Sequence, residues 1–270
     1  MTSLCRKERA SLKILHEFLY DSFLQRRKEI LEVQQCNNNN DDGLETQNTM
    51  IDHIVLNEEK FTKEEILDQL LNFIAGYEIW ANALCHAMLL LAMHPEIQEK
   101  LFEEIKRAAD SLPNTEDVEL IKNIEYLDMV QKETYRLMPT VPTVLRQTME
   151  DFEIEPGLII PKETNLLINF YALHRRKDVW GDNANQFVPE RFSQENSKDR
   201  PSSSYLPFSA GSRICIAYRY SNISLKIAMM KLVQRFTFKT SMKMEDMRVK
   251  SYISLKLCTP HLISVQAREK

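Results

Sequence analysis

Residues 62–93 carry one helical pattern that is apolar on most faces, and this pattern limits what the chain can fold into. Thr62 and Glu65 form a T-x-x-E capping box just before the apolar run. The first proline of the chain is Pro95, and proline ends a helix because it lacks an N–H group. A helix that is apolar on most sides must be covered by other segments. The sequence therefore predicts a long central helix over 62–93.

The rest of the chain is predicted to be mostly helical. It contains only 5 glycines in 270 residues, which favours a helix-rich fold over an all-β one. Apolar residues recur at helical spacing in three further segments, which we expect to be an amphipathic helix over 1–36, a helix over 124–138 and a last helix over 216–236.

Strands and irregular segments are predicted in the remaining stretches. Alternating apolar residues and turn signals predict strands over 144–171 and a closing hairpin over 252–266. An Asn- and Asp-rich stretch predicts a polar loop over 37–49, and 175–213 is predicted to be irregular. The expected fold class is mainly α with small β-sheets, and 43% hydrophobic residues can form a sizeable core.

Charge and cysteine content argue against several classes of protein. The formal net charge is −4, so a general nucleic-acid-binding protein is not expected. The 5 cysteines form no C-x-x-C pair and leave one over in any pairing, so neither a disulfide framework nor a structural zinc site is expected. Reduced thiols fit a protein that faces the cytosol.

A membrane anchor is not expected in this chain. The N-terminal residues lack the apolar core of a secretory signal. The longest apolar stretch, 83–93, is shorter than the ~20 residues that cross a bilayer. We interpret it as part of a buried core helix.

Gly76 and Glu78 break local rules inside the central helix. Glycine in a helix interior costs about 1 kcal/mol relative to alanine. A carboxylate in an apolar helix is costly unless it is paired or hydrated. A packing glycine beside a surface glutamate is the simpler interpretation, and a functional site along the helix is the alternative.

Glu133 and Arg136 are spaced as an i,i+3 pair in the helix over 124–138. On a surface such a pair contributes only about 0.2–0.5 kcal/mol. Considered alone, it indicates no more than an ordinary surface pair.

Cys215 lies just before the last helix, in a setting that favours a thiolate. The free N–H groups and the dipole at a helix N-terminus stabilise an anion, and Arg213 adds a positive charge nearby. Gly211 permits a tight loop and the close approach of a flat ligand. A thiolate can be a metal ligand or a nucleophile, and a nucleophile would need a base such as His174 or His261.

Together these stretches resemble the cytochrome P-450 family, because four of its motifs occur in order. They are similar to the oxygen-binding groove of the central helix, the E-x-x-R helix, the P-E-R-F segment and the haem-binding loop. The corresponding residues are Ala75-Gly76-Tyr77-Glu78, Glu133-x-x-Arg136, Phe187-Val188-Pro189-Glu190-Arg191-Phe192 and Phe208-x-x-Gly211-x-Arg213-x-Cys215. The local sequence looks most similar to insect members of the clan related to fatty-acid ω-hydroxylases. The resemblance covers nearly the whole chain and implies the C-terminal haem-binding part of that fold, with the N-terminal half missing.

The resemblance implies roles for individual residues. Cys215 would be the thiolate ligand of haem b, and such a ligand favours O–O cleavage. Glu78 would be the catalytic acidic residue of the central helix. The haem contacts would include Phe208 and Gly211 in the loop, and Arg146, His174 and Arg213 at the propionates. Glu133, Arg136 and Arg191 would form a buried structural cluster, and Gly76 would also be structural.

The function implied is a haem-thiolate monooxygenase acting on a lipophilic small molecule. Electrons would come from NADPH through cytochrome P-450 reductase, at the cytosolic face of the endoplasmic reticulum membrane. Basic residues on the last helix would meet the reductase or simply form a solvated face: Arg219, Lys226, Lys231 and Arg235. No nucleic-acid partner is expected.

Two alternatives stay open. Ile79 and Trp80 stand where the family usually has hydroxyl side chains, and isoleucine cannot form a hydrogen bond. One alternative is therefore a truncated, catalytically impaired or inactive remnant of such an enzyme. The other is a thiol hydrolase that uses Cys215 with a histidine.

Overall fold

The computed structural model describes residues 3–37, 49–251, 253–258 and 262–268, and side chains over 6–33 within the first of these ranges. Most of the polar loop predicted at 37–49 therefore lies outside the described residues. The chain forms two compact units, Met1–Tyr77 and Glu78–Lys270. Helix α3, Lys63–Met93, contributes residues to both units.

The first unit is helical. It contains α1 (Ser3–Asn37), α2 (Met50–Val55), a 3₁₀ turn η1 (Glu58–Lys60) and the beginning of α3. Its core is aliphatic and aromatic, because the apolar positions of each helix fall on one face. The buried members are Leu19, Phe23, Ile30, Ile54, Val55, Ile66 and Leu70.

Two capping boxes define helix starts in this unit. Glu65 N–H donates to Thr62 Oγ1 at 3.2 Å while Thr62 N–H donates to the Glu65 carboxylate at 2.8 Å, as the sequence predicts for the start of α3. Thr49 and Asp52 form the equivalent box on α2. Asp52 is buried, and its hydrogen bond from Arg26 at 2.6 Å lowers the pKa of its carboxyl to about 2.

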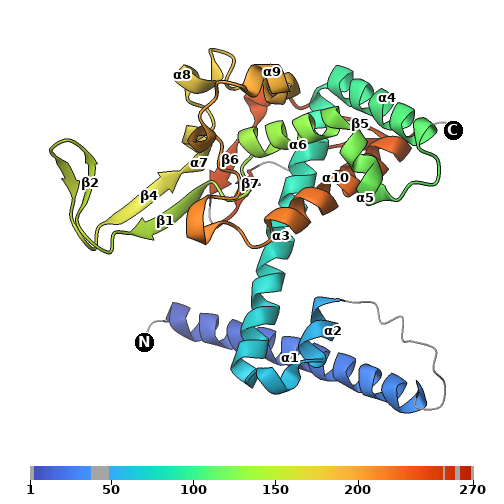
Figure 1. The fold of residues 1–270 in the computed structure, drawn as a ribbon, viewed down its shortest axis with the longest axis vertical. Coiled ribbons are helices and arrows are strands. Elements are labelled where there is room, and N and C mark those ends of the chain that lie inside the picture. Colours follow the sequence, from blue (N-terminus) through green and yellow to red (C-terminus); the bar gives the residue numbers. More distant parts are fainter. Residues whose placement is uncertain (1–2, 38–48, 252, 259–261, 269–270) are drawn as a thin grey trace. The chain divides into compact units, whose positions relative to one another are not determined.

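The second unit is a helical core around the end of α3. Its main helices are α4 (Pro95–Ser111), α5 (Asp117–Leu120), α6 (Glu125–Leu137) and α10 (Tyr218–Arg235), with a 3₁₀ turn η2 (Ile121–Asn123). α10 packs against both α4 and α6 (Figure 1). Leu89, Leu90 and Leu91 of α3 are fully buried, as expected for a core helix. By length and composition α3 is the one helix in the described chain that could cross a membrane, a test that core helices of soluble proteins also pass.

The strands predicted within 144–171 form two antiparallel ladders. β1 (Thr143–Gln147) pairs with β4 (Asn165–Asn169) (Figure 1). The chain between these two strands forms the second ladder, in which β2 (Phe152–Glu155) pairs with β3 (Leu158–Ile160). Gly157 has φ +82° between β2 and β3, a conformation that glycine adopts without strain. A short helix, α7 (Phe170–Leu173), follows β4 directly.

The prediction of a closing hairpin over 252–266 is wrong. β7 (Leu255–Leu257) pairs with β6 (Val249–Ser251), and β8 (Ser264–Ala267) pairs with β5 (Phe236–Lys239). Each strand finds a partner that precedes it in the chain, so the two strands are not each other's neighbours. The three residues of β6 are too few and too polar to be recognised as a strand from local pattern.

The irregular stretch from 175 to 213 contains only short turns. These are α8 (Lys177–Trp180), η3 (Pro189–Phe192), α9 (Gln194–Ser197), η4 (Ser202–Ser204) and η5 (Gly211–Arg213). η3 packs on α6. This stretch therefore depends on side chains of α6 for its position, and it leads directly into the loop that carries Cys215.

Candidate functional site

Cys215 is held by its backbone and presents its side chain to the surface. Its N–H donates to the carbonyl of Phe208 at 3.0 Å, which closes the loop on itself. Its own carbonyl accepts from Tyr218 N–H at 3.3 Å, at the start of α10. The thiol is exposed. The thiol is therefore open to an external partner at the start of a long helix.

The shape of the loop depends on two residues with positive φ. Gly211 has φ +75° and Ser209 has φ +64°. Among the described residues, nothing lies within 4 Å of a Cβ built on Gly211. The backbone conformation at Gly211, and not crowding within the protein, is therefore what favours glycine there.

The loop that carries Cys215 is rich in aromatic and apolar side chains. The Phe208 ring makes edge-to-face contacts with Tyr135 at 5.2 Å and with Tyr218 at 5.3 Å, which fixes the start of the loop against α6 and α10. Ile214 and Ile216 flank Cys215 and are 46% and 96% exposed. Exposed apolar side chains on both sides of a thiol suit a ligand with a large apolar face.

Two arginines belong to the same region. Arg146 on β1 is half-buried, and its Nη2 donates to Ser209 Oγ at 3.2 Å. The structure thus brings the predicted Arg146 to the Cys215 loop although the two are far apart in sequence. Arg213 is exposed at the end of η5. A guanidinium beside an apolar surface is suited to pairing with the carboxylate of a bound molecule.

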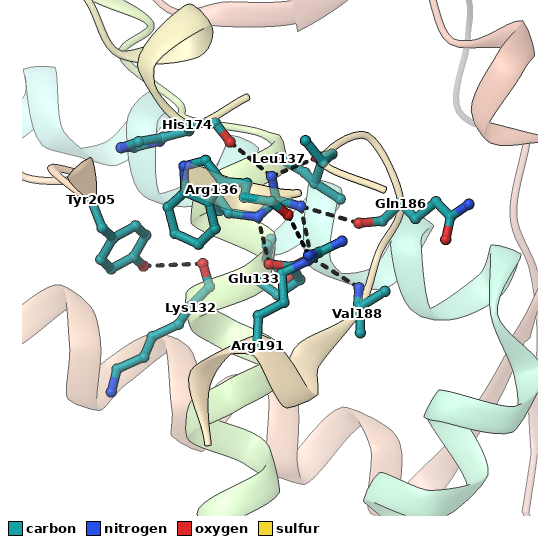
Figure 2. A network of polar contacts seen from close by, with 12 residues as sticks. Lys132, Glu133, Arg136, Leu137, His174, Gln186, Val188, Arg191 and Tyr205 are labelled. Atoms are coloured by element: carbon teal, nitrogen blue, oxygen red, sulfur yellow. Dashed lines mark hydrogen bonds and ion pairs between the residues drawn. The ribbon is translucent and has the colours of Figure 1, made fainter. Parts of the chain in front are cut away.

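The structure also brings together the predicted charge cluster of Glu133, Arg136 and Arg191 (Figure 2). Glu133 and Arg136 form a two-point ion pair with N–O distances of 2.7 and 2.8 Å, and both side chains are fully buried. Arg191 lies 3.4 Å from the same carboxylate. The pair is therefore buried, in contrast to the surface pair that the spacing alone suggested.

The Arg136 side chain holds the irregular stretch by hydrogen bonds to backbone carbonyl groups of that stretch. Its guanidinium donates to the carbonyls of His174 at 2.7 Å, Ala184 at 2.6 Å and Gln186 at 3.1 Å (Figure 2). Glu133 in turn accepts from Val188 N–H at 2.9 Å. A segment without regular secondary structure has few backbone-to-backbone hydrogen bonds, so these bonds from side chains satisfy its polar backbone groups instead.

Arg191 extends the cluster with two more backbone bonds. It donates to the carbonyl of Trp180 at 2.8 Å and to that of Asn183 at 2.5 Å. Burial lowers the pKa of Arg191, and the Glu133 carboxylate opposes that effect. The cluster thus binds five carbonyl groups and one N–H group of the segment that ends in the Cys215 loop.

His174 is a buried side chain that hydrogen-bonds to the backbone. Its ring is fully buried, and its Nε2 accepts the N–H of Leu206 at 2.9 Å. The bond positions the chain two residues before Phe208. These contacts favour a structural role, and the contact of His174 with a haem propionate stays a prediction.

Stability is expected to fall below neutral pH because of His174. Burial, aided by Arg136 and Arg175, lowers its pKa from 6.5 to about 4. The unfolded chain therefore binds a proton at a higher pH than the folded one, and the stabilisation present above pH 6.5 is lost as the pH falls toward 4. The loss is about 3 kcal/mol. Urea unfolding at pH 7, 5.5 and 4.5 measures it.

His174→Gln is the matched variant for this measurement. A glutamine Oε1 can accept the Leu206 N–H but does not titrate in this range. The part of the pH slope that belongs to His174 should disappear in this variant. An unchanged slope would assign the pH dependence to other groups.

Glu78 is partly exposed and paired with the C-terminal segment. Its carboxylate lies 2.5 Å from Lys256 Nζ and accepts from Ser254 Oγ at 3.1 Å. Two residues further along α3, Trp80 faces another element, since its Nε1 donates to Ser224 Oγ on α10 at 2.9 Å. Gly76, in the first unit, has no described neighbour within 4 Å of a Cβ position, so close packing does not explain it.

Comparison with known proteins shows the family of this chain. The sequence profile of the family "Cytochrome P450" matches residues 1–263. This chain belongs to the cytochrome P450 family. Its relatives include "Probable cytochrome P450 313a4" of Drosophila melanogaster, 37% identical over 77% of this chain and 42% of the relative. They also include "Cytochrome P450 3A17" of Cavia porcellus and "Cytochrome P450 3A13" of Mus musculus, each 39% identical over 76% of this chain and 41% of the relative.

The chain spans about 40% of the length of these cytochrome P450 relatives. Its fold is a partial cytochrome P450 fold, mainly helical with small antiparallel sheets, as the sequence predicts. The family implies a haem cofactor. The residues around Cys215 fit such a group, because an exposed thiol, exposed isoleucines and Arg146 occur together at one loop.

Sequence reasoning missed several residues that support this cytochrome P450 site. Tyr205 donates its hydroxyl to the carbonyl of Lys132 at 3.0 Å (Figure 2), and Arg175 donates to the carbonyl of Leu137. Ser254 and Lys256 were also missed. Each contact joins segments far apart in the chain, and a single serine, tyrosine or lysine carries no local signal of a distant partner. His261, named as a candidate base, lies outside the described residues.

Proposed function

We propose that this chain is the haem-thiolate part of a monooxygenase that inserts oxygen into a lipophilic small molecule. The observation that carries the proposal is the Cys215 thiol, which is exposed between two exposed isoleucines. The segment that leads into this loop is held by a buried charge cluster. Membership of the cytochrome P450 family supports a haem-thiolate monooxygenase in general.

In this proposal each residue has a defined task. Cys215 is the thiolate ligand of haem b, and a thiolate-bound haem supplies the oxygen chemistry. Arg146 and Arg213 pair with the propionate groups, while Phe208 and Gly211 shape the loop. Loop position is the task of the Glu133–Arg136–Arg191 cluster, because a ligand that is misplaced by about 1 Å loses much of its effect.

Glu78 handles protons in this scheme. A carboxylate on the central helix can accept a proton from water and release it again, provided that it is hydrated and ionised at neutral pH. Glu78 is half exposed, and its pairing with Lys256 and Ser254 lowers its pKa. Its environment is therefore compatible with the task, although Ile79 beside it offers no hydroxyl group.

NADPH would supply the electrons through cytochrome P-450 reductase, and the working location would be the cytosolic face of the endoplasmic reticulum. On α10, Arg219 and Arg235 are exposed, whereas Lys226 and Lys231 pair with Asp128 and Asp117 at 2.5 and 2.6 Å. The positive charge open to an acidic partner on this helix is thus carried mainly by the arginines.

An impaired or inactive form of the enzyme is the second candidate. Its support is that Ile79 cannot form a hydrogen bond and that Trp80 directs its indole N–H to Ser224. Such a form would fail to turn over, whether it holds haem or not. The thiol hydrolase has no comparable support, because His174 is buried and bonded to Leu206.

The test is the carbon-monoxide difference spectrum of the reduced, haem-supplemented chain, followed by NADPH oxidation with reductase and a lipophilic substrate. The red-shifted Soret band of thiolate-ligated haem together with product formation would establish the monooxygenase. The band without product would select the impaired form. No band would exclude the monooxygenase and would leave an inactive remnant that does not hold haem.

A further inference from the structure

A carboxylate, an ammonium group and a hydroxyl group meet beside α3. Glu78 Oε1 lies 2.5 Å from Lys256 Nζ and accepts from Ser254 Oγ at 3.1 Å. Ser254 is 5% exposed, while the Glu78 and Lys256 side chains are 53% and 44% exposed. Both partners come from the C-terminal segment, so a second element fixes the carboxylate.

The segment that supplies these partners is firmly held. Leu255 N–H donates to the carbonyl of Thr140, just after α6, at 2.8 Å. Leu255 and Leu257 are buried, and β7 is paired with β6. Because side chains alternate along a strand, Lys256 points away from these leucines. The backbone position from which the Lys256 side chain extends is therefore fixed.

A second lysine lies beside Lys256 on the β6–β7 strand pair. Lys250 stands opposite Lys256 in the β6–β7 register, so the strand pair carries a second positive charge. Hydrogen bonds from Lys256 and then from Ser254 lower the pKa of Glu78, and Asn82 on the same helix adds a smaller effect. The adjacent Ile79 contributes no hydrogen bond. The C-terminal segment therefore supplies the charged partner of Glu78.

We propose that Ser254 and Lys256 are positioning residues that hold the Glu78 carboxylate charged and in one orientation. The inference rests on the proposed function, in which Glu78 handles protons for the monooxygenase. Lys256 supplies the charge, and the buried Ser254 supplies the direction, because a hydroxyl fixed in the interior restricts the carboxylate to one rotamer.

The first test needs no haem. In the full chain labelled with ¹³C at glutamate carboxyl carbons, the signal lost in Glu78→Gln identifies Glu78. Its pKa should rise in Lys256→Met, rise less in Ser254→Ala, and stay low in Lys256→Arg. Lys243→Met, which removes an exposed lysine from a 3.8 Å surface pair with Glu245, is the matched control. Equal Glu78 pKa values in the wild type and Lys256→Met would overturn the proposal.

The second test measures the consequence for the reaction. In the haem-loaded chain with reductase, Lys256→Met and Glu78→Gln should each raise the hydrogen peroxide released per NADPH several-fold. The double variant should show no further increase, and Lys256→Arg should restore the wild-type ratio. Independent, multiplying effects of the two substitutions would overturn the positioning role. If the chain shows no thiolate-ligated haem spectrum, the proposed function fails, and the titration still decides whether Lys256 and Ser254 hold Glu78.

Discussion

Replacing Cys215 with alanine should abolish the red-shifted Soret band of the reduced carbon-monoxide complex. An alanine cannot donate a thiolate to iron, so any haem that still binds would have a different axial ligand and a different spectrum. Alanine needs no more room than cysteine at an exposed position, so the fold should be unchanged. The measurement is the difference spectrum of the two haem-supplemented proteins at equal concentration.

Other thiols provide the control for this experiment. Cys85 and Cys258 are also exposed, and Cys85→Ala and Cys258→Ala should keep the wild-type spectrum. Circular dichroism of each variant checks the helix content. A band that persists in Cys215→Ala but disappears in one of the other variants would show that the other cysteine is the ligand, and it would contradict the assignment of Cys215. A band that persists in all three would exclude these cysteines as sole ligands.

Arg136→Met should unfold or strongly destabilise the second unit. The substitution leaves the fully buried Glu133 carboxylate without its two-point partner, at a cost of roughly 3–5 kcal/mol. The carbonyls of His174, Ala184 and Gln186 also lose their donor. Because a domain is stable by only about 5–15 kcal/mol, this is a large part of the total. Urea unfolding followed by circular dichroism gives the free energy of unfolding.

Arg176→Met is the matched control. Arg176 forms an exposed pair with Asp178, so its replacement should leave the free energy of unfolding almost unchanged. Arg191→Met should lie between the two variants, because Arg191 is partly exposed and contacts Glu133 at a longer distance. A loss of less than about 1 kcal/mol in Arg136→Met would contradict the role assigned to the cluster.

The Glu133–Arg136 pair shows what the spacing of two residues in the sequence can and cannot predict. Glu133 and Arg136 are one of the commonest pairs on a helix, and their spacing correctly places both on one side of α6. Whether that side faces water or protein depends on what packs against it. Here the segment from 175 to 213 covers it, and burial changes an interaction of a few tenths of a kcal/mol into one of several.

Glu78 and the C-terminal strands show the reverse. The sequence identifies Glu78 as an unusual residue of α3, but its partners Ser254 and Lys256 lie on a strand whose pairing was predicted wrongly. Strand pairing depends on which edges are brought together by the rest of the fold, and short polar strands such as β6 have almost no periodic pattern.

By itself the sequence determined the helices predicted over 1–36, 62–93, 124–138 and 216–236, the strands of 144–171 and the family, because these follow from local periodicity, caps, turn residues and motif order. Only the tertiary structure decided that Glu133 and Arg136 are buried, that His174 holds Leu206, that Arg146 reaches Ser209, and that Lys256 meets Glu78. Each of these contacts joins segments distant in the chain. Their energy depends on burial and on the distance between groups, and neither quantity is fixed until the segments pack together.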